Sequence, residues 1–208
     1  MSQPCSHIRE AAGPARGLLH RSVPGGTTEH LRLLPRPELA PYVAHFWWVR
    51  WELTQPFIAE TLPHPCIHMV FETTGRAEVV GVVDHRFTRK LEGDGRVLGV
   101  KFRPGAFWPF VGGSVSRWTN TTVPVEQLKF MGPQVAEQVA VLISSVEVTT
   151  AVAAAEALLL LSLPCAPLCA EVLQIRDLVE QMETDRSCLR VEDAARRVGV
   201  SVRTLERR

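Results

Sequence analysis

The sequence contains no apolar run long enough to cross a bilayer, for which about 18–20 residues are needed. Its longest candidate is the 13-residue stretch 151–163, and that stretch carries the charged residue Glu156. The N-terminal residues also lack a basic block followed by an apolar one, because polar and charged residues from His7 to Arg16 interrupt them. We therefore expect no membrane partner and no secretory signal, and we predict a cytoplasmic protein.

Cysteines are few and follow no pattern. The chain has five, an odd number, and they are widely scattered. This excludes a disulfide framework of the kind that staples small secreted domains, and it suits a reducing cytosol. Cys165 and Cys169 stand close together but lack the further ligands that a zinc site needs. We interpret them as plain thiols.

Motifs for common cofactors and for covalent catalysis are also missing. There is no phosphate-binding loop, no dinucleotide fingerprint and no Gly-x-Ser-x-Gly nucleophile elbow. We therefore predict that the protein is not an enzyme and uses no cofactor. The net charge gives no positive signal either, because 23 basic and 22 acidic side chains leave +1. Total charge alone does not indicate a nucleic-acid partner.

The composition that remains is that of a globular protein, 46% hydrophobic and 22% charged over 208 residues. This length allows one ordinary domain or one domain and part of another. Residues 1–30 are rich in proline and glycine, which predicts a flexible arm. Alternating or aromatic runs then predict strands over 42–51, 66–71, 78–83, 85–91 and 96–102. An Asp-Gly pair at 94–95 is typical of a hairpin turn between the last two, and such closely spaced strands predict a small antiparallel sheet or barrel.

Helices are predicted in the second half of the chain. Apolar residues recur at helical spacing from about residue 133, at Val135, Val139, Leu142 and Ile143. The stretch 151–161 is rich in strong helix formers, and 168–182 is typical of an amphipathic helix.

Near the C-terminus, residue types follow an informative order. Ala195 is small, so a second helix can cross close above it, and Gly199 can take the left-handed conformation that ends a helix. Ser201 can then cap the next helix. The apolar residues that would hold the two helices together are Ala194, Val198, Val200 and Leu205. This is the layout of a helix-turn-helix, whose second helix enters the major groove of DNA.

The local charge supports this interpretation. From Arg186 to Arg208, seven arginines against three carboxylates give +4, which leaves −3 for the rest of the chain. A basic segment on a mildly acidic body is typical of a DNA-reading tip. Arg190 occupies the capping position of the first helix, at a cost of roughly 1 kcal/mol, which Glu192 and Asp193 partly offset through the helix dipole. The alternative is an ordinary helical hairpin with a basic, solvated face.

The stretch 191–207 resembles the first helix-turn-helix of AraC/XylS-type bacterial transcription regulators. Three upstream phrases resemble the N-terminal domain found in a branch of that family: LAPYVAHFW at 39–47, TLPHP at 61–65 and GVKFRPGAF at 99–107. The likeness covers roughly residues 15–208, and the order and spacing of the phrases make the combination specific.

The resemblance implies an N-terminal β-rich sensing or dimerising domain and a C-terminal DNA-binding domain with two helix-turn-helix units joined by a long helix. It also implies that this chain stops inside the first recognition helix, so that the second unit is absent. We predict an α+β fold, with a small antiparallel, cupin-like sheet or barrel followed by helices and an incomplete helix-turn-helix. The predicted parts are a flexible arm (1–30), a β-rich sensing or dimerisation domain (31–125), a helical connector (126–163) and a truncated DNA-binding domain (168–208).

The resemblance further assigns roles within the recognition helix. Arg203, Glu206 and Arg207 match base-facing positions, and Ser201 and Thr204 match positions near the phosphates. Glu206 stands where an amide such as Gln is common, and a carboxylate there would favour the amino group of cytosine over adenine. The implied partners are double-stranded DNA for the intact protein, a small-molecule effector and a second copy of the chain in a homodimer.

Two other groups of residues are candidates for chemistry. His64, Cys66, His68 and Glu72 share one parity and would face the same side of a strand. Histidine and carboxylate can bind a divalent metal, as in a cupin-like enzyme. However, eight residues of extended strand span about 26 Å at ~3.3 Å per residue, so His64 and Glu72 cannot share one ion. We favour satisfied or solvated polar side chains and predict no metal site.

Tryptophan forms the second group. Five indoles, at Trp47, Trp48, Trp51, Trp108 and Trp118, could wall a pocket for a flat apolar effector. We favour core packing for most of them. A ligand-binding or dimerising module without DNA binding of its own therefore stands as the rival to a DNA-binding regulator.

Overall fold

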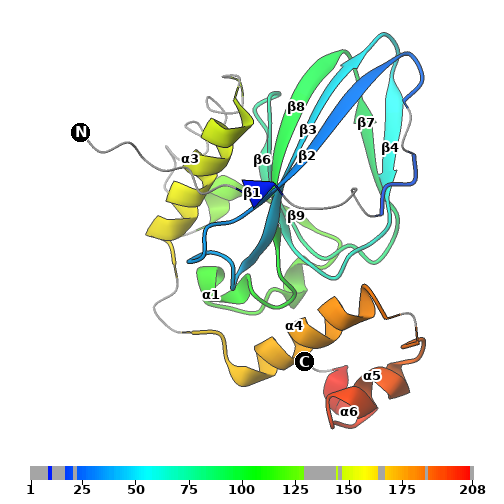
Figure 1. Cartoon of the computed structure of the whole chain (residues 1–208), viewed down its shortest axis with the longest axis vertical. Helices are drawn as coiled ribbons and strands as arrows, with labels where there is room; N and C mark the ends of the chain where they lie inside the picture. The colour runs from blue at the N-terminus through cyan, green and yellow to red at the C-terminus, as the bar shows by residue number, and fades with distance from the viewer. Residues whose placement is uncertain are drawn as a thin grey trace.

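The computed structural model describes residues 9–10, 17–20, 23–128, 144, 147–163, 167–185 and 187–206. The chain folds into an antiparallel seven-stranded sheet and a separate two-stranded sheet, followed by helices (Figure 1). The mixed α+β class predicted from the sequence is confirmed. In spatial order the large sheet consists of β1 (Arg9–Glu10), β2 (Gly26–Leu34), β3 (Val43–Leu53), β8 (Asp94–Phe102), β5 (His68–Glu72), β6 (Ala77–Val80) and β9 (Thr122–Pro124). The small sheet pairs β4 (Phe57–Thr61) with β7 (Phe87–Leu91).

The hairpin predicted around Asp94-Gly95 is wrong. β7 pairs with β4, whereas β8 pairs with β3 and β5, so the two strands belong to different sheets. Asp94 and Gly95 are the first residues of β8, opposite Glu52 and Trp51 of β3. Glycine is needed there for a different reason, since a Cβ on Gly95 would lie 2.2 Å from a ring carbon of Trp51. Gly95, which predicted a turn from the sequence, is thus a strand residue on which the indole ring of Trp51 packs closely.

Alternation along the strands separates two faces of the large sheet. The face that carries Phe46, Phe71 and Leu98 forms the main core, and helix α3 (Val148–Leu161) packs on it through small and apolar side chains. Figure 1 shows α3 lying beside the large sheet. The opposite face turns toward the β4–β7 pair, where Trp51, Leu53 and Leu91 form a second, smaller core. The two sheets therefore enclose a space between them.

Helix α3 is attached to the sheet by a buried charge. Glu156, the residue that interrupts the longest apolar run, is fully buried. Its two carboxylate oxygens accept hydrogen bonds from the backbone nitrogen of Arg36, at 2.7 Å, and from Arg36 Nε, at 2.9 Å. A buried carboxylate is tolerated when it is paired and hydrogen-bonded. Glu156 thus fixes α3 against the segment that follows β2.

The helices predicted at 151–161 and 168–182 are both present, as α3 and as α4 (Ala170–Met182). The helix predicted from about residue 133 lies outside the described residues. Two short helices follow α4, α5 (Val191–Arg197) and α6 (Val202–Leu205). The loop after β8 contains α1 (Trp108–Val111), and two 3-10 turns flank β9, at Ser116–Trp118 and Val125–Gln127.

Two further observations concern the ends of the β-rich part and the helices. β2 begins at Gly26, within the stretch predicted as a flexible arm, and Leu18 forms a bridge with Thr61 of β4.

Among the described residues, no helix combines the length and the apolar character needed to cross a membrane.

Candidate functional site

Residues 190–206 form a helix, a tight turn and a second helix. Gly199 has a left-handed φ of +67°, and the backbone nitrogen of Val200 donates to the carbonyl of Ala195 at 3.0 Å, which closes the turn. Ser201 caps α6, because its Oγ accepts a hydrogen bond from the backbone nitrogen of Thr204 at 3.2 Å. The turn residues therefore do what their chemistry predicts.

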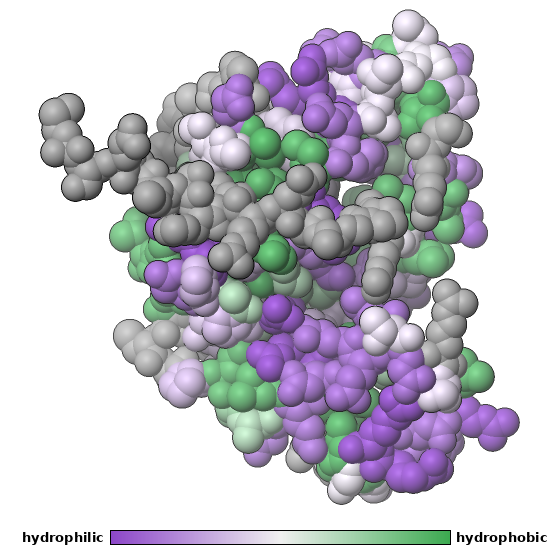
Figure 2. All heavy atoms as spheres, viewed as in Figure 1, coloured by the Kyte–Doolittle hydropathy of each residue, from purple (hydrophilic) through white to green (hydrophobic). Residues whose placement is uncertain are grey.

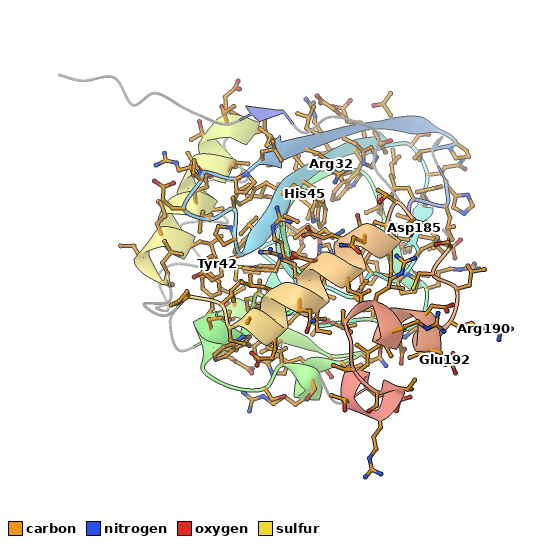
Figure 3. The ribbon with its side chains drawn as sticks, turned by 60° about the horizontal axis from the view of Figure 1, so that its bottom comes forward. Arg32, Tyr42, His45, Asp185, Arg190 and Glu192 are labelled. Carbon is orange, nitrogen blue, oxygen red and sulfur yellow. The ribbon has the colours of Figure 1, made fainter. Side chains whose placement is uncertain are left out.

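The start of α5 also follows the sequence interpretation. Arg190 stands at the N-cap and makes no side-chain cap, while Glu192 and Asp193 occupy the first turn. Figure 3 shows Arg190 and Glu192 at the end of the molecule that α5 and α6 form.

These two helices share a small core with α4. The apolar residues predicted for it, Ala194, Val198, Val200 and Leu205, are joined by Leu178 of α4 and Cys188 of the connecting loop. Gln174 of α4 adds a hydrogen bond from Nε2 to the carbonyl of Val198, 3.0 Å long. Sequence reasoning missed Leu178, Cys188 and Gln174, because they lie before the motif. The apolar periodicity of α4 could have indicated Leu178, whereas nothing in the sequence marked Cys188 or Gln174. The three helices form one unit.

The residues assigned to DNA contact fall on the outside of this unit. Arg203 and Glu206 are exposed, Thr204 is half-buried, and the Oγ atoms of Ser201 and Thr204 lie 2.9 Å apart. Arg207, the remaining predicted contact, lies outside the described residues. Hydrophilic side chains dominate the visible surface over α4, α5 and α6 (Figure 2).

The other arginines of α5 contact acids of the same unit. Arg196 pairs with Asp193 at 3.1 Å, and Arg197 pairs with Asp185 at 2.7 Å. Hydrogen bonds from Ser187, together with Arg197, lower the pKa of Asp185 to about 2. Asp185 therefore stays charged and ties the loop after α4 to the end of α5.

A second candidate site lies between the two sheets. The space is a cavity of about 340 Å³, within the size range of small-molecule sites. Its walls come from strands of both sheets, and they combine aromatic, aliphatic and charged side chains. The sequence indicated that tryptophans could wall a pocket but not that the pocket lies between two sheets, although the alternation along β3 and β8 marks the residues that face it.

A row of basic side chains crosses one end of the cavity. In the sheet register His45 of β3 lies opposite Lys101 of β8, and Lys101 lies opposite His68 of β5. Arg32 of β2 joins the row by donating from Nη2 to Nδ1 of His45 at 3.1 Å. Figure 3 shows Arg32 and His45 close together, near the C-terminal half of α4.

The hydrogen bonds fix the protonation of both histidines. Trp47 Nε1 can only donate, and it lies 3.2 Å from Nδ1 of His68. The neutral ring of His68 therefore carries its proton on Nε2, which faces the Sγ of Cys66 at 3.6 Å. By the same argument, the arginine that donates to Nδ1 of His45 places the proton of His45 on Nε2.

Burial keeps this end of the cavity from gaining further charge. It lowers the pKa of His68 to about 3, with help from Lys101. It also lowers the pKa of His45 to about 3, with further contributions from Arg32 and Lys101. Burial raises the pKa of Cys66 to about 11. At neutral pH the positive charge therefore resides on Lys101 and Arg32, beside neutral imidazoles and a neutral thiol.

The floor next to this row is an indole ring. Trp47 lies opposite Gly99 in the register, and a Cβ on Gly99 would lie 1.8 Å from the ring. Glycine thus allows the ring to lie against the backbone of β8. Trp47 and Trp51 both face the cavity, Trp48 and Trp118 belong to the main core, and Trp108 is 38% exposed. Some of the five tryptophans therefore pack in the core and others line the cavity.

The candidate metal ligands are engaged with other partners. His68 contacts Trp47 and Cys66, and both carboxylate oxygens of Glu72 accept from Arg89, at 2.7 and 2.9 Å. Within the part of the chain that the structure describes, no three His, Cys, Asp or Glu side chains lie together as metal ligands would. Satisfied polar side chains, the reading favoured from the sequence, account for the geometry of His68 and Glu72.

A cleft of about 230 Å³ separates the sheet from α4 and adjoins the basic row. Lys101 reaches Glu183, just beyond the end of α4, with 3.5 Å between Nζ and Oε1. Arg103 forms an ion pair with Glu180 of α4 and donates from Nε to the carbonyl of Ala40 at 2.7 Å. Lys101, which lines the cavity, thus pairs with a residue at the end of the helix that supports α5 and α6.

Comparison with known proteins gives one match. Residues 31–124 match the family model described as "Domain of unknown function (DUF6597)". The matched range runs from within β2 to the end of β9, so it includes most of the strands that line the cavity. Neither the search of curated proteins nor the search of solved structures found a match.

Proposed function

We propose that the protein is a DNA-binding transcription regulator of the AraC/XylS type, cytoplasmic, whose β-rich part senses a small molecule. The observation that carries this proposal is the α5–turn–α6 geometry, with Gly199 closing the turn, Ser201 capping α6 and Arg203 exposed. A helix-turn-helix presents its second helix to the major groove in this way. Arg203 is suited to a bidentate contact with guanine.

A separate core supports this interpretation over an ordinary helical hairpin. Leu178, Ala194 and Val198 pack together in a cluster distinct from the main core of the sheet. The unit therefore has packing of its own and does not use α5 and α6 to cover the sheet. α4 also packs Val172 and Leu173 against the main core, whereas the apolar side chains of α5 and α6 pack within the unit.

The proposal is tested by titrating the chain into a labelled random-sequence DNA duplex. Fluorescence anisotropy measures the binding over a range of salt concentrations. A single helix-turn-helix should bind near the non-specific range of about 10⁻⁴–10⁻⁶ M, with affinity falling as salt rises. Arg203→Ala should weaken binding, because it removes a positive charge from the face that α6 presents to DNA. Arg50→Ala, which removes an exposed arginine of β3, is the matched control and should leave the affinity unchanged.

A second candidate function is a ligand-binding or dimerising module without DNA binding. The cavity favours the ligand-binding part of this alternative. The same anisotropy series separates the two: equal affinities of the unaltered chain, Arg203→Ala and Arg50→Ala would favour the module and remove α6 as a reading helix.

A further inference from the structure

Lys101 lies where the cavity meets the DNA-binding unit. It lines both the cavity and the cleft under α4, and its side chain is only 14% exposed. Its ion pair with Glu183 measures 3.5 Å, longer than the 2.7–2.9 Å of a tight charge-assisted hydrogen bond. Glu183 itself is 41% exposed. A largely buried ammonium group thus has a partly solvated carboxylate, 3.5 Å away, as its partner.

The other carboxylates of the cavity wall lie beside different cations. Glu72 is held by Arg89, and Glu60 by Arg86. Glu78 pairs with Arg76. These pairs do not involve Lys101, so the carboxylate that faces Lys101 in this structure is supplied by the helical unit.

The surroundings of Lys101 suit a second anion equally well. The rings of His45 and His68 lie on either side of Lys101 in the register and add no charge. The ring of His45 carries an N–H on Nε2, whereas the N–H of His68 faces Cys66. The indole of Trp47, the neighbouring floor of the cavity, offers a flat apolar surface. Apolar walls with a few convergent polar groups are typical of a small-molecule site.

We propose that the cavity binds a small organic anion with a flat apolar body, whose carboxylate displaces Glu183 from Lys101 and so loosens the end of α4. A ligand shifts a conformational equilibrium only by its differential affinity for the two states. Here the difference arises because Lys101 cannot hold both carboxylates closely at once. Release of Glu183 leaves in place the ion pair between Arg103, the residue after β8, and Glu180 of α4. The consequence for DNA rests on the proposed function, whereas the binding step does not.

The binding step is tested with two probes of the same shape, 2-naphthoate and its uncharged amide, 2-naphthamide. Quenching of tryptophan fluorescence in the full chain reports their affinities. We expect naphthoate to bind at least about tenfold more tightly, as one charge-assisted contact would give. Equal affinities, or no binding of either probe, would overturn the proposal.

Two substitutions separate the specific contact from a structural effect. Lys101→Met should remove the preference for naphthoate over naphthamide. Glu183→Gln should tighten naphthoate binding several-fold and leave naphthamide unchanged, because it removes the competing carboxylate. Lys90→Met, which alters an exposed lysine of β7 paired with Glu92, is the control and should change neither affinity. An unchanged naphthoate affinity in Glu183→Gln would contradict the competition between naphthoate and Glu183 for Lys101. This result holds even if Lys101→Met does not fold.

Release of the helix is tested by amide hydrogen exchange. Saturating naphthoate should speed exchange over residues 179–185 and leave α3 unchanged. Unchanged or slower exchange over 179–185 would contradict the release. None of these measurements contains DNA. A negative result here would therefore not count against the DNA-binding proposal, and a failure of DNA binding would not count against binding of the anion.

Discussion

Glu156 of α3 and Arg36, which follows β2, form a two-point contact in which a fully buried carboxylate accepts from a backbone nitrogen at 2.7 Å and from a guanidinium at 2.9 Å. This contact explains how a charged residue persists in the longest apolar stretch of the sequence. It also identifies the attachment of α3 to the sheet as a specific polar contact embedded in apolar packing.

Replacing Glu156 by alanine should lower the free energy of unfolding by about 1–3 kcal/mol, because the backbone N–H of Arg36 loses its buried acceptor. Loss of the carboxylate affects the Arg36 guanidinium less than the backbone N–H, because the Arg36 side chain is 41% exposed and water can replace the lost partner. Urea unfolding followed by circular dichroism measures the change. Glu52→Ala removes a carboxylate from the exposed pair with Arg50 and should stay within about 0.5 kcal/mol of the unaltered chain. Comparable losses in both variants would refute the special role of Glu156.

Gly99→Ala should disturb both the sheet and the cavity. The added Cβ would lie 1.8 Å from the Trp47 ring, so the indole must move, at a cost of about 1–3 kcal/mol. The tryptophan emission spectrum should shift in the folded state, and thermal unfolding should occur at lower temperature. At Gly113 a Cβ would meet nothing within 4 Å, so Gly113→Ala serves as the control. An unchanged spectrum in Gly99→Ala would contradict the close packing of Trp47.

Acid should destabilise the fold through His45 and His68. The pKa of each is lowered from 6.5 to about 3 in the folded chain, so below pH 6.5 the unfolded chain binds protons that the folded chain excludes. The free energy of unfolding therefore keeps the full contribution of the two neutral histidines above about pH 6.5. It falls as the pH drops toward about 3, by up to ~1.4 kcal/mol per pH unit for each histidine.

Urea unfolding at pH 7 and pH 5 measures this dependence. His45→Gln with His68→Gln should reduce the difference between the two pH values, and His85→Gln, at an exposed position, should not. The same pH dependence in all three proteins would contradict burial of the two neutral rings.

The turn between α5 and α6 should depend on the left-handed φ of Gly199, which is +67°. Gly199→Val places a β-branched side chain in that conformation, at a cost of at least about 1–2 kcal/mol. Hydrogen exchange of the amides from Val202 to Glu206 should accelerate. Gly199→Asn should restore much of the protection, because asparagine tolerates this conformation. Equal exchange in all three chains would show that the turn has another conformation in solution.

The sequence predicted local features well, because each rested on the chemistry of single residues. Gly199, Ser201 and Arg190 occupy the turn, cap and N-cap positions expected of them. The strand alternation separated Met69 and Phe71, which are buried in the main core, from His68. The predicted division into four parts and the predicted DNA contacts stay predictions.

Features that depend on which strands are neighbours could not be predicted. The Asp94-Gly95 pair indicated a hairpin, but Gly95 is glycine because Trp51 packs on it. The basic row joins His45, Lys101 and His68 from three strands. Alternation within one strand gives the face of a residue but neither its neighbour strand nor its register, so the cavity required the structure.

The most direct test of the central claim is a map of DNA contacts by ¹H–¹⁵N NMR of the full chain titrated with a short duplex at low salt. We expect the amide signals of α5, the turn at Gly199 and α6 to move, with the largest shifts at Arg203 and its neighbours, while the signals of β3 and α3 stay in place. Shifts that spare residues 191–206, or that spread evenly over the sheet, would contradict a helix-turn-helix that reads DNA.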